Sequence, residues 1–157
     1  MTFGKEIIII ELIGIIAFAI SGAIVAIKKH FDLFGIIVLG VITAVGGGAL
    51  RDIILGIIPP TMFKNSLYVF VAFLTSCIAF GAAAVAAVKF KKNKQFFIDA
   101  VNFFDAIGLG VFAVTGTNTA IINGFEHNAF LAIFVGVITG IGGGMMRDIL
   151  AGKVPFV

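Results

Sequence analysis

Two short stretches of this sequence place three glycines and a charged pair inside apolar surroundings. The first is Gly46-Gly47-Gly48-Ala49-Leu50-Arg51-Asp52, and the second is Gly142-Gly143-Gly144-Met145-Met146-Arg147-Asp148. Glycine costs a helix interior about 1 kcal/mol relative to alanine, so each triplet predicts a kink or local unwinding that exposes backbone carbonyls. Carbonyl oxygens and charged side chains are the groups with which channels select ions. The motif therefore predicts a pathway for a cation.

The arginine and the aspartate of each motif need partners. An ionised side chain at the centre of a bilayer costs about 2.5–3.5 kcal/mol on insertion scales, so it usually faces the protein interior or a watery path. Arg51 and Asp52 lie about 100° apart around a helix, which places them poorly to satisfy each other. We expect each to find a partner on another helix or in water, beside the pathway, and the same holds for Arg147 and Asp148. The alternative is a purely structural ion pair.

Other polar residues within apolar segments are further candidates for the pathway lining. The hydroxyl and amide candidates are Ser21, Thr43, Thr115, Thr117, Asn118 and Thr139. Such hydroxyls often bond back to their own helix instead. Glu11 and Asp105 occupy equivalent places near the starts of two apolar segments, where an acid either lines the pathway or simply complements the positive end of a helix. The sequence predicts no metal site beyond a permeating monovalent cation.

Glycine-rich segments also occur in nucleotide-binding proteins and enzymes, but the surrounding residues do not fit those classes. The segments lack the Lys-Ser/Thr of a phosphate-binding loop, and residues 46–51 lack the last glycine of the dinucleotide fingerprint. No Ser/His/Asp or Cys/His constellation is recognisable, and the single cysteine, Cys77, is interpreted as a packing residue. We therefore predict no enzyme activity, no cofactor and no nucleic-acid partner.

The composition places these motifs in an all-α integral membrane protein. Hydrophobic residues make up 61% of the 157 positions and charged residues 12%, whereas soluble domains carry about 25% charged residues. Apolar runs of about twenty residues suffice to cross a bilayer core. We expect five transmembrane helices, over 7–27, 33–58, 67–88, 103–122 and 129–151. Barrel strands are excluded because their residues alternate between apolar and polar.

The lysines indicate how these helices are oriented. If all five segments cross, only Lys5 and Lys64 fall on one face of the membrane. The other face receives Lys28, Lys29, Lys89, Lys91, Lys92, Lys94 and Lys153. Short basic loops stay in the cytoplasm, so the N-terminus is expected outside.

The second half of the chain repeats the first. Residues 11–22 align with 105–116, and residues 40–59 align with 136–155, including both glycine motifs. A repeat of three helices enters the membrane from the opposite side the second time, and inverted repeats of this kind place a pathway near their interface. The alternative is a duplication kept only for packing.

The repeat also defines the expected organisation of the chain. We expect residues 1–94 to form the first three-helix repeat with a basic cytoplasmic linker. Residues 95–157 form the second, inverted repeat, which stops after its second helix, so we expect the sequence to be part of a longer protein. Glycines at intervals of four suggest close helix packing in lipid; we assign this role to Gly40, Gly56, Gly136, Gly140 and Gly152.

These motifs resemble a known family. An acid-x-Ile-Gly-x-x-x-Phe-Ala-x-Ser/Thr-Gly helix followed by Gly-Gly-Gly-x-x-Arg-Asp, present twice between residues 11 and 155, resembles the prokaryotic relatives of the trimeric intracellular cation (TRIC) channels. The resemblance implies a protomer of seven helices, assembled as a homotrimer in the plasma (inner) membrane of a prokaryote. It also implies a pore in each protomer, lined mainly by the second and fifth helices and bent at residues 46–48 and 142–144.

Three functions remain open from the sequence. The first is a passive, potassium-permeable channel for monovalent cations, with K⁺ or Na⁺ and membrane lipids as its partners. The second is a carrier of glycine or a similar small zwitterion, because the same family also bears the name of a bacterial glycine transporter. In that case an arginine holds the carboxylate and an aspartate the ammonium group. The third is a membrane scaffold that conducts nothing.

Overall fold

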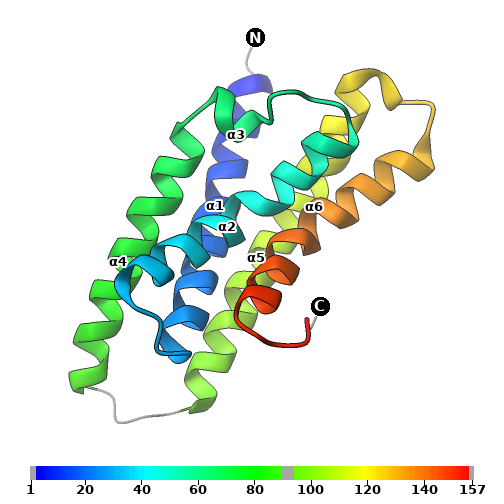
Figure 1. The fold of residues 1–157 in the computed structure, drawn as a ribbon. Helices are drawn as coiled ribbons and strands as arrows, with labels where there is room; N and C mark the ends of the chain where they lie inside the picture. The colour runs from blue at the N-terminus through cyan, green and yellow to red at the C-terminus, as the bar shows by residue number, and fades with distance from the viewer. Residues whose placement is uncertain (1–2, 90–93, 156–157) are drawn as a thin grey trace.

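The computed structural model describes residues 3–89 and 94–155, and this part of the chain forms helices joined by turns and short loops, without strands. Its helices are α1 (Phe3–Lys28), α2 (Leu33–Ile54), the short α3 (Thr61–Lys64), α4 (Leu67–Lys89), α5 (Lys94–Ala120), the π-helical turn η1 (Ile121–Phe125) and α6 (Ala129–Leu150). Figure 1 shows α1, α4 and α5 along one elongated bundle, with α2 and α6 oblique to them and packed against each other. The prediction of an all-α protein is confirmed.

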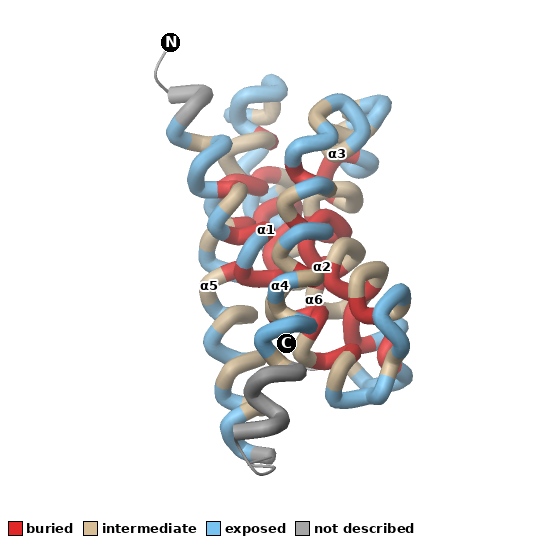
Figure 2. The backbone as a smooth tube through the Cα atoms, turned by 90° about the vertical axis from the view of Figure 1, so that its left-hand side faces the viewer, coloured by how far each residue is buried: buried red, intermediate tan, exposed pale blue. Residues whose placement is uncertain are grey.

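The helices suit a bilayer. Among the residues that the structure describes, four spans are long and apolar enough to cross it, and a shorter apolar helix covers Leu67–Ala83. The four spans are Glu6–Lys28, Leu33–Ile54, Gln95–Phe125 and Ala129–Leu150. Buried residues concentrate in the middle of the bundle, whereas the outer faces and both ends are exposed (Figure 2). The exposed faces carry large apolar side chains such as Phe34, Phe103 and Phe130, which is the pattern of a protein surrounded by lipid.

The helix boundaries differ from the expected ones most clearly in α1, α2 and α5. α5 begins at Lys94 instead of residue 103, and α2 ends at Ile54 instead of residue 58. The short α3 was not predicted. Because α1 begins at Phe3 and α5 at Lys94, Glu11 and Asp105 lie well inside their helices. Their predicted position near helix starts is therefore wrong.

Matching caps begin and end the two motif helices. The side chain of Asp32 accepts a hydrogen bond from the backbone N–H of Gly35 at 2.8 Å, and that of Asn128 accepts one from the backbone N–H of Leu131 at 3.0 Å. At the other end, Gly56 and Gly152 have φ of 71° and 65°, and the following amides donate to the carbonyls of Asp52 and Asp148 at 2.8 Å. This is a Schellman C-cap, which favours glycine at the left-handed position.

The cap explains two glycines that the sequence assigned to packing. A Cβ added at Gly56 or Gly152 would have no neighbour within 4 Å. The packing interpretation is wrong for these two glycines, whose positive φ is the reason for the residue type. It is confirmed for Gly40, Gly136 and Gly140, where an added Cβ would meet Ser76, Thr117 and the carbonyl of Leu109.

The first two glycines of each triplet lie at the crossing of α2 and α6. An added Cβ at Gly47 would collide with the carbonyl oxygen of Thr139, and one at Gly143 with that of Thr43. Gly46 likewise faces Met146, and Gly142 faces Leu50. These contacts are equivalent in the two repeats, so α2 and α6 pack against each other through the same pair of glycines.

The predicted unwinding at the triplets is wrong. Residues 46–48 and 142–144 are α-helical, and no non-helical torsion interrupts α2 or α6. Close packing of two glycine surfaces offsets the cost of glycine in a helix. A bend without unwinding remains a prediction.

The contact between α1 and α5 also pairs residues that are equivalent in the two repeats. Phe18 stacks on Phe112, its counterpart in the repeat, with ring centroids 5.4 Å apart. Gly14 lies against Phe112, and Gly108 lies against Phe18. Because both residue pairs follow one antiparallel register, Ser21 lies level with Asp105 and Thr115 level with Glu11. α1, α2 and α4 thus form a three-helix unit, and α5 and α6 repeat its first two helices in the inverted orientation.

Candidate functional site

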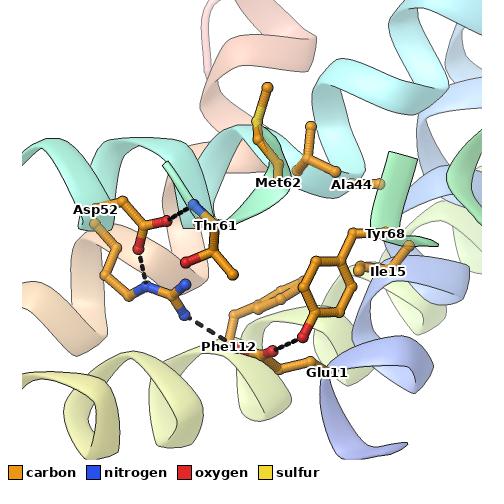
Figure 3. A pocket seen from close by; sticks show the side chains of 11 residues that line it. Glu11, Ile15, Ala44, Asp52, Thr61, Met62, Tyr68 and Phe112 are labelled. Atoms are coloured by element: carbon orange, nitrogen blue, oxygen red, sulfur yellow. Dashed lines mark hydrogen bonds and ion pairs between the residues drawn. The ribbon is translucent and has the colours of Figure 1, made fainter. Parts of the chain in front are cut away.

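The buried charges of the first motif form a cluster with residues from three other helices, here called the Arg51 cluster (Arg51, Asp52, Glu11, Thr61 and Tyr68). Arg51 donates from Nη1 to Glu11 at 3.1 Å and from Nε to Asp52 at 2.8 Å. The Tyr68 hydroxyl donates to the other Glu11 oxygen at 2.8 Å, and the Thr61 amide donates to Asp52 at 2.6 Å. Figure 3 shows the Asp52 carboxylate pointing toward Thr61 and the Glu11 carboxylate pointing toward the hydroxyl of Tyr68.

The second motif forms the Arg147 cluster (Arg147, Asp148, Asp105 and Ser21). Arg147 donates from Nε to Asp148 at 2.9 Å, and from Nη1 to both oxygens of Asp105 at 2.6 Å. The same Nη1 lies 2.6 Å from the hydroxyl oxygen of Ser21, on a helix of the other repeat. Both arginines and their neighbouring aspartates are buried, with at most 5% of their surface exposed.

One expectation about these pairs is wrong and another is confirmed. Adjacent arginine and aspartate do bond to each other in both clusters, because the long arginine side chain curls back so that Nε reaches the neighbouring carboxylate. Each arginine also has a partner on another helix, as predicted, and these partners are Glu11 and Asp105.

Each cluster carries more negative than positive charge. One arginine faces two carboxylates, so the residues of each cluster by themselves have a formal charge of −1 when ionised. Lys28 and Lys153 line one cavity beside the Arg147 cluster and supply positive charge there, whereas no lysine is among the residues that line the cavity of the Arg51 cluster. A buried net charge in an apolar bundle is costly unless a counter-charge is available. An excess carboxylate beside a cavity is therefore suited to attract a cation.

The two clusters differ in the space beside them. The cavity at the Arg51 cluster measures about 30 Å³, and Met62 and Tyr68 are among the residues that line it. The Arg147 cluster adjoins two larger cavities of about 160 and 320 Å³. Asn102 and Asp105 line both of these cavities, whereas Lys28 and Lys153 line only the cavity of about 160 Å³. Burial lowers the pKa of Lys153. The positive charges of Lys28 and Arg147 lower this pKa further, whereas the negative charge of Asp148 raises it by a smaller amount than the total lowering.

The hydroxyl candidates lie apart from these cavities. Thr43, Thr117 and Thr139 bond to carbonyls of the preceding turn of their own helices. Ser21 contacts Arg147, and Thr115 is buried without a hydrogen-bond partner among the described residues. None of these five residues, nor Asn118, is among the residues that line the three cavities. Their role as pore lining stays a prediction.

Sequence reasoning missed three residues of the site. Tyr68 binds Glu11, the Thr61 amide binds Asp52, and Asn102 lines both larger cavities. Tyr68 is the only tyrosine in the chain, which is a weak signal. Asn102 lies three residues before Asp105, and hence on the same helix face.

Known proteins with this architecture point to one family. The model of the family described as "Glycine transporter" matches residues 8–84 and 102–157. A membrane protein of Deinococcus radiodurans, named UPF0126, is 40% identical over 94% of this chain and 64% of its own length. The YadS inner membrane protein of Escherichia coli is 38% identical over 94% of this chain and 67% of its own. The chain thus spans about two thirds of the length of these relatives.

Solved structures show the same fold. The TRIC trimeric intracellular cation channel orthologue from Rhodobacter sphaeroides superposes with a TM-score of 0.85 at 33% identity, over 98% of this chain and 74% of that one. A prokaryotic TRIC channel in 0.5 M KCl gives 0.86 at 32%, over 97% and 73%. The chain belongs to the TRIC channel family. A further TRIC cation channel, studied for its conductance, is 42% identical with a TM-score of 0.76, over 94% of this chain and 68% of that one. The expected family is thereby confirmed, and the TRIC family member described here is a membrane protein.

Proposed function

We infer that this TRIC family chain forms a passive channel for monovalent cations, permeable to potassium. The buried charges carry the proposal: each repeat buries one arginine, in the last turn of α2 or α6, against two carboxylates and beside a cavity. The TRIC cation channels with the same fold support it. The path would run along α2 and α6 past the two clusters, and electrostatics and geometry would act on the ion without covalent chemistry.

The same clusters support a second candidate, a carrier of glycine. An arginine can bind a carboxylate and an excess aspartate can bind an ammonium group, and the matching family model is described as a glycine transporter. The net charge of −1 in the Arg51 cluster, whose cavity has no lysine in its lining, favours a cation over a neutral zwitterion, since a zwitterion leaves that charge uncompensated.

The assembly and orientation are part of the proposal. We place 1–94 and 95–157 as the two inverted repeats, the N-terminus outside and the basic loops in the cytoplasm of a prokaryotic cell. We propose a homotrimer because the structurally similar protein from Rhodobacter sphaeroides is named a trimeric intracellular cation channel orthologue. Chemical cross-linking in native membranes tests the trimer, and thiol labelling of Lys5→Cys and Lys29→Cys from either side tests the orientation.

One flux comparison separates the functions. The protein is reconstituted into vesicles, and potassium-driven voltage is measured beside uptake of radiolabelled glycine. We expect a potassium-driven voltage, which weakens when Glu11→Gln or Asp105→Asn removes the excess charge. Saturable glycine uptake without ionic current would overturn the channel and support the carrier. Passage of neither would support a scaffold.

A further inference from the structure

We propose that the glycines of each triplet have two different roles, and that the third glycine sets the clearance of the path beside its arginine. The third glycine is Gly48 in α2 and Gly144 in α6. The first two glycines serve the crossing of α2 and α6. The inference rests on the proposed function, because clearance matters only if something passes.

The surroundings of the glycines differ sharply. An added Cβ at Gly47 or Gly143 would meet a backbone carbonyl of the opposite helix, which cannot move without shifting that helix. For Gly48 the nearest such atom is Nη2 of Arg51, at 3.9 Å, and no other lies within 4 Å. Gly144 repeats this contact, with Nη2 of Arg147 at the same 3.9 Å. The same arrangement of glycine and arginine thus occurs in both repeats.

The space in front of the third glycines belongs to the cavities. Gly48 lines the cavity of about 30 Å³ together with Arg51, and Gly144 lines the cavity of about 320 Å³ together with Arg147. A water molecule needs about 10–15 Å³, so the smaller cavity has room for about two water-sized particles. A side chain at position 48 would take up much of this room.

The arginines place positive charge along the same surface. Both use Nε and Nη1 for the hydrogen bonds within their clusters, and in both it is Nη2 that lies beside the third glycine. A particle passing there meets a guanidinium edge, and Glu11 or Asp105 lines the same cavity. The absence of a side chain at Gly48 and Gly144 keeps it close to both groups.

Packing alone does not account for the third glycine. Alanine is favoured over glycine in a helix interior, and positions 48 and 144 have helical torsions with space for a methyl group. If the third glycine had no role beyond occupying a helical position, alanine would be tolerated in every respect, and if it served packing, alanine would lower the unfolding temperature. A role in clearance predicts that alanine is tolerated by the fold and harmful to flux.

The test compares Gly48→Ala and Gly144→Ala with Gly47→Ala and Gly143→Ala. Unfolding temperature in detergent and potassium flux in vesicles are measured for each variant. We expect Gly48→Ala and Gly144→Ala to unfold at or above the temperature of the unmodified protein, yet to lose flux severalfold. Gly48→Val should reduce flux further, and caesium should be excluded before potassium. Gly47→Ala and Gly143→Ala should lower the unfolding temperature.

Gly110→Ala is the matched control, because Gly110 is helical with nothing near an added Cβ. Its flux should match that of the unmodified protein. Unchanged flux in Gly48→Ala and Gly144→Ala would overturn the clearance role while leaving the channel intact. Unfolding of these two variants at the reduced temperature of Gly47→Ala would also overturn it, in favour of packing. Absence of potassium flux and glycine uptake in the unmodified protein would reject the proposed function itself, and the clearance role with it.

Discussion

Ser21 of α1 lies 2.6 Å from Nη1 of Arg147 of α6, a contact across 126 positions that joins the two repeats. The equivalent pair in the other half, Thr115 and Arg51, is not formed. Thr115 lies level with Glu11 in the register of α1 and α5, but its hydroxyl is buried without a partner. Two sites built from the same motif therefore differ in how the arginine connects the repeats.

This difference predicts opposite effects for two similar substitutions. Ser21→Ala removes a hydrogen bond to a charged group, which should destabilise the protein by about 1.5–3 kcal/mol. Thr115→Val keeps the shape of the side chain and removes an unpaired buried hydroxyl, so it should be neutral or stabilising. Denaturant unfolding in detergent checks both. Equal losses of stability in the two variants would contradict the assignment of Thr115 as unpaired.

Tyr68 ties α4 to the Arg51 cluster. Tyr68→Phe removes the donor to Glu11 and leaves that carboxylate with Arg51 alone, so a loss of about 1.5–3 kcal/mol in the free energy of unfolding is expected. A double-mutant cycle with Glu11→Gln checks the origin of the loss. Non-additivity of at least about 0.5 kcal/mol is expected for a direct contact, and strict additivity would show that the two side chains act separately.

The C-cap glycines offer a test of the helix ends. Gly56→Ala and Gly152→Ala force a Cβ into a left-handed conformation, which costs roughly 1–2 kcal/mol. Gly81→Ala is the control, because Gly81 is in a regular helix with no atom near an added Cβ. That variant should gain up to about 1 kcal/mol. Unfolding midpoints give the comparison, and a loss in Gly81→Ala matching that in Gly56→Ala would count against the cap.

Lys153 gives a pH dependence. Its pKa in the folded protein is lowered from 10.5, first by burial. Between the lowered pKa and 10.5 the unfolded chain binds more protons at this side chain, so stability rises with pH in this window. The effect is well under about 1 kcal/mol because the side chain is mostly exposed. Unfolding temperatures measured from neutral pH to pH 10 should rise less in Lys153→Gln, and an identical slope would contradict the shift.

Much of the fold could be predicted from the sequence because its causes are local or periodic. Apolar runs of bilayer length identify the helices, and alignment of residues 11–59 with 105–155 identifies the repeat. The pairing of each arginine with an acid on another helix followed from the cost of a buried charge. The signals failed at α3 and at the start of α5, since neither a single turn nor a polar helix extension carries an apolar run.

Only the tertiary structure decided what each motif residue does. The three glycines of a triplet are identical in sequence, yet the crossing of α2 and α6 places Gly47 against a carbonyl and leaves Gly48 beside a cavity. Likewise, the repeat makes Ser21 and Thr115 equivalent, and the packing of the arginines makes them different. Composition and periodicity determined that this chain forms a membrane bundle of inverted repeats. The direction in which each side chain points depends on helix rotation and crossing, which contacts between distant segments establish.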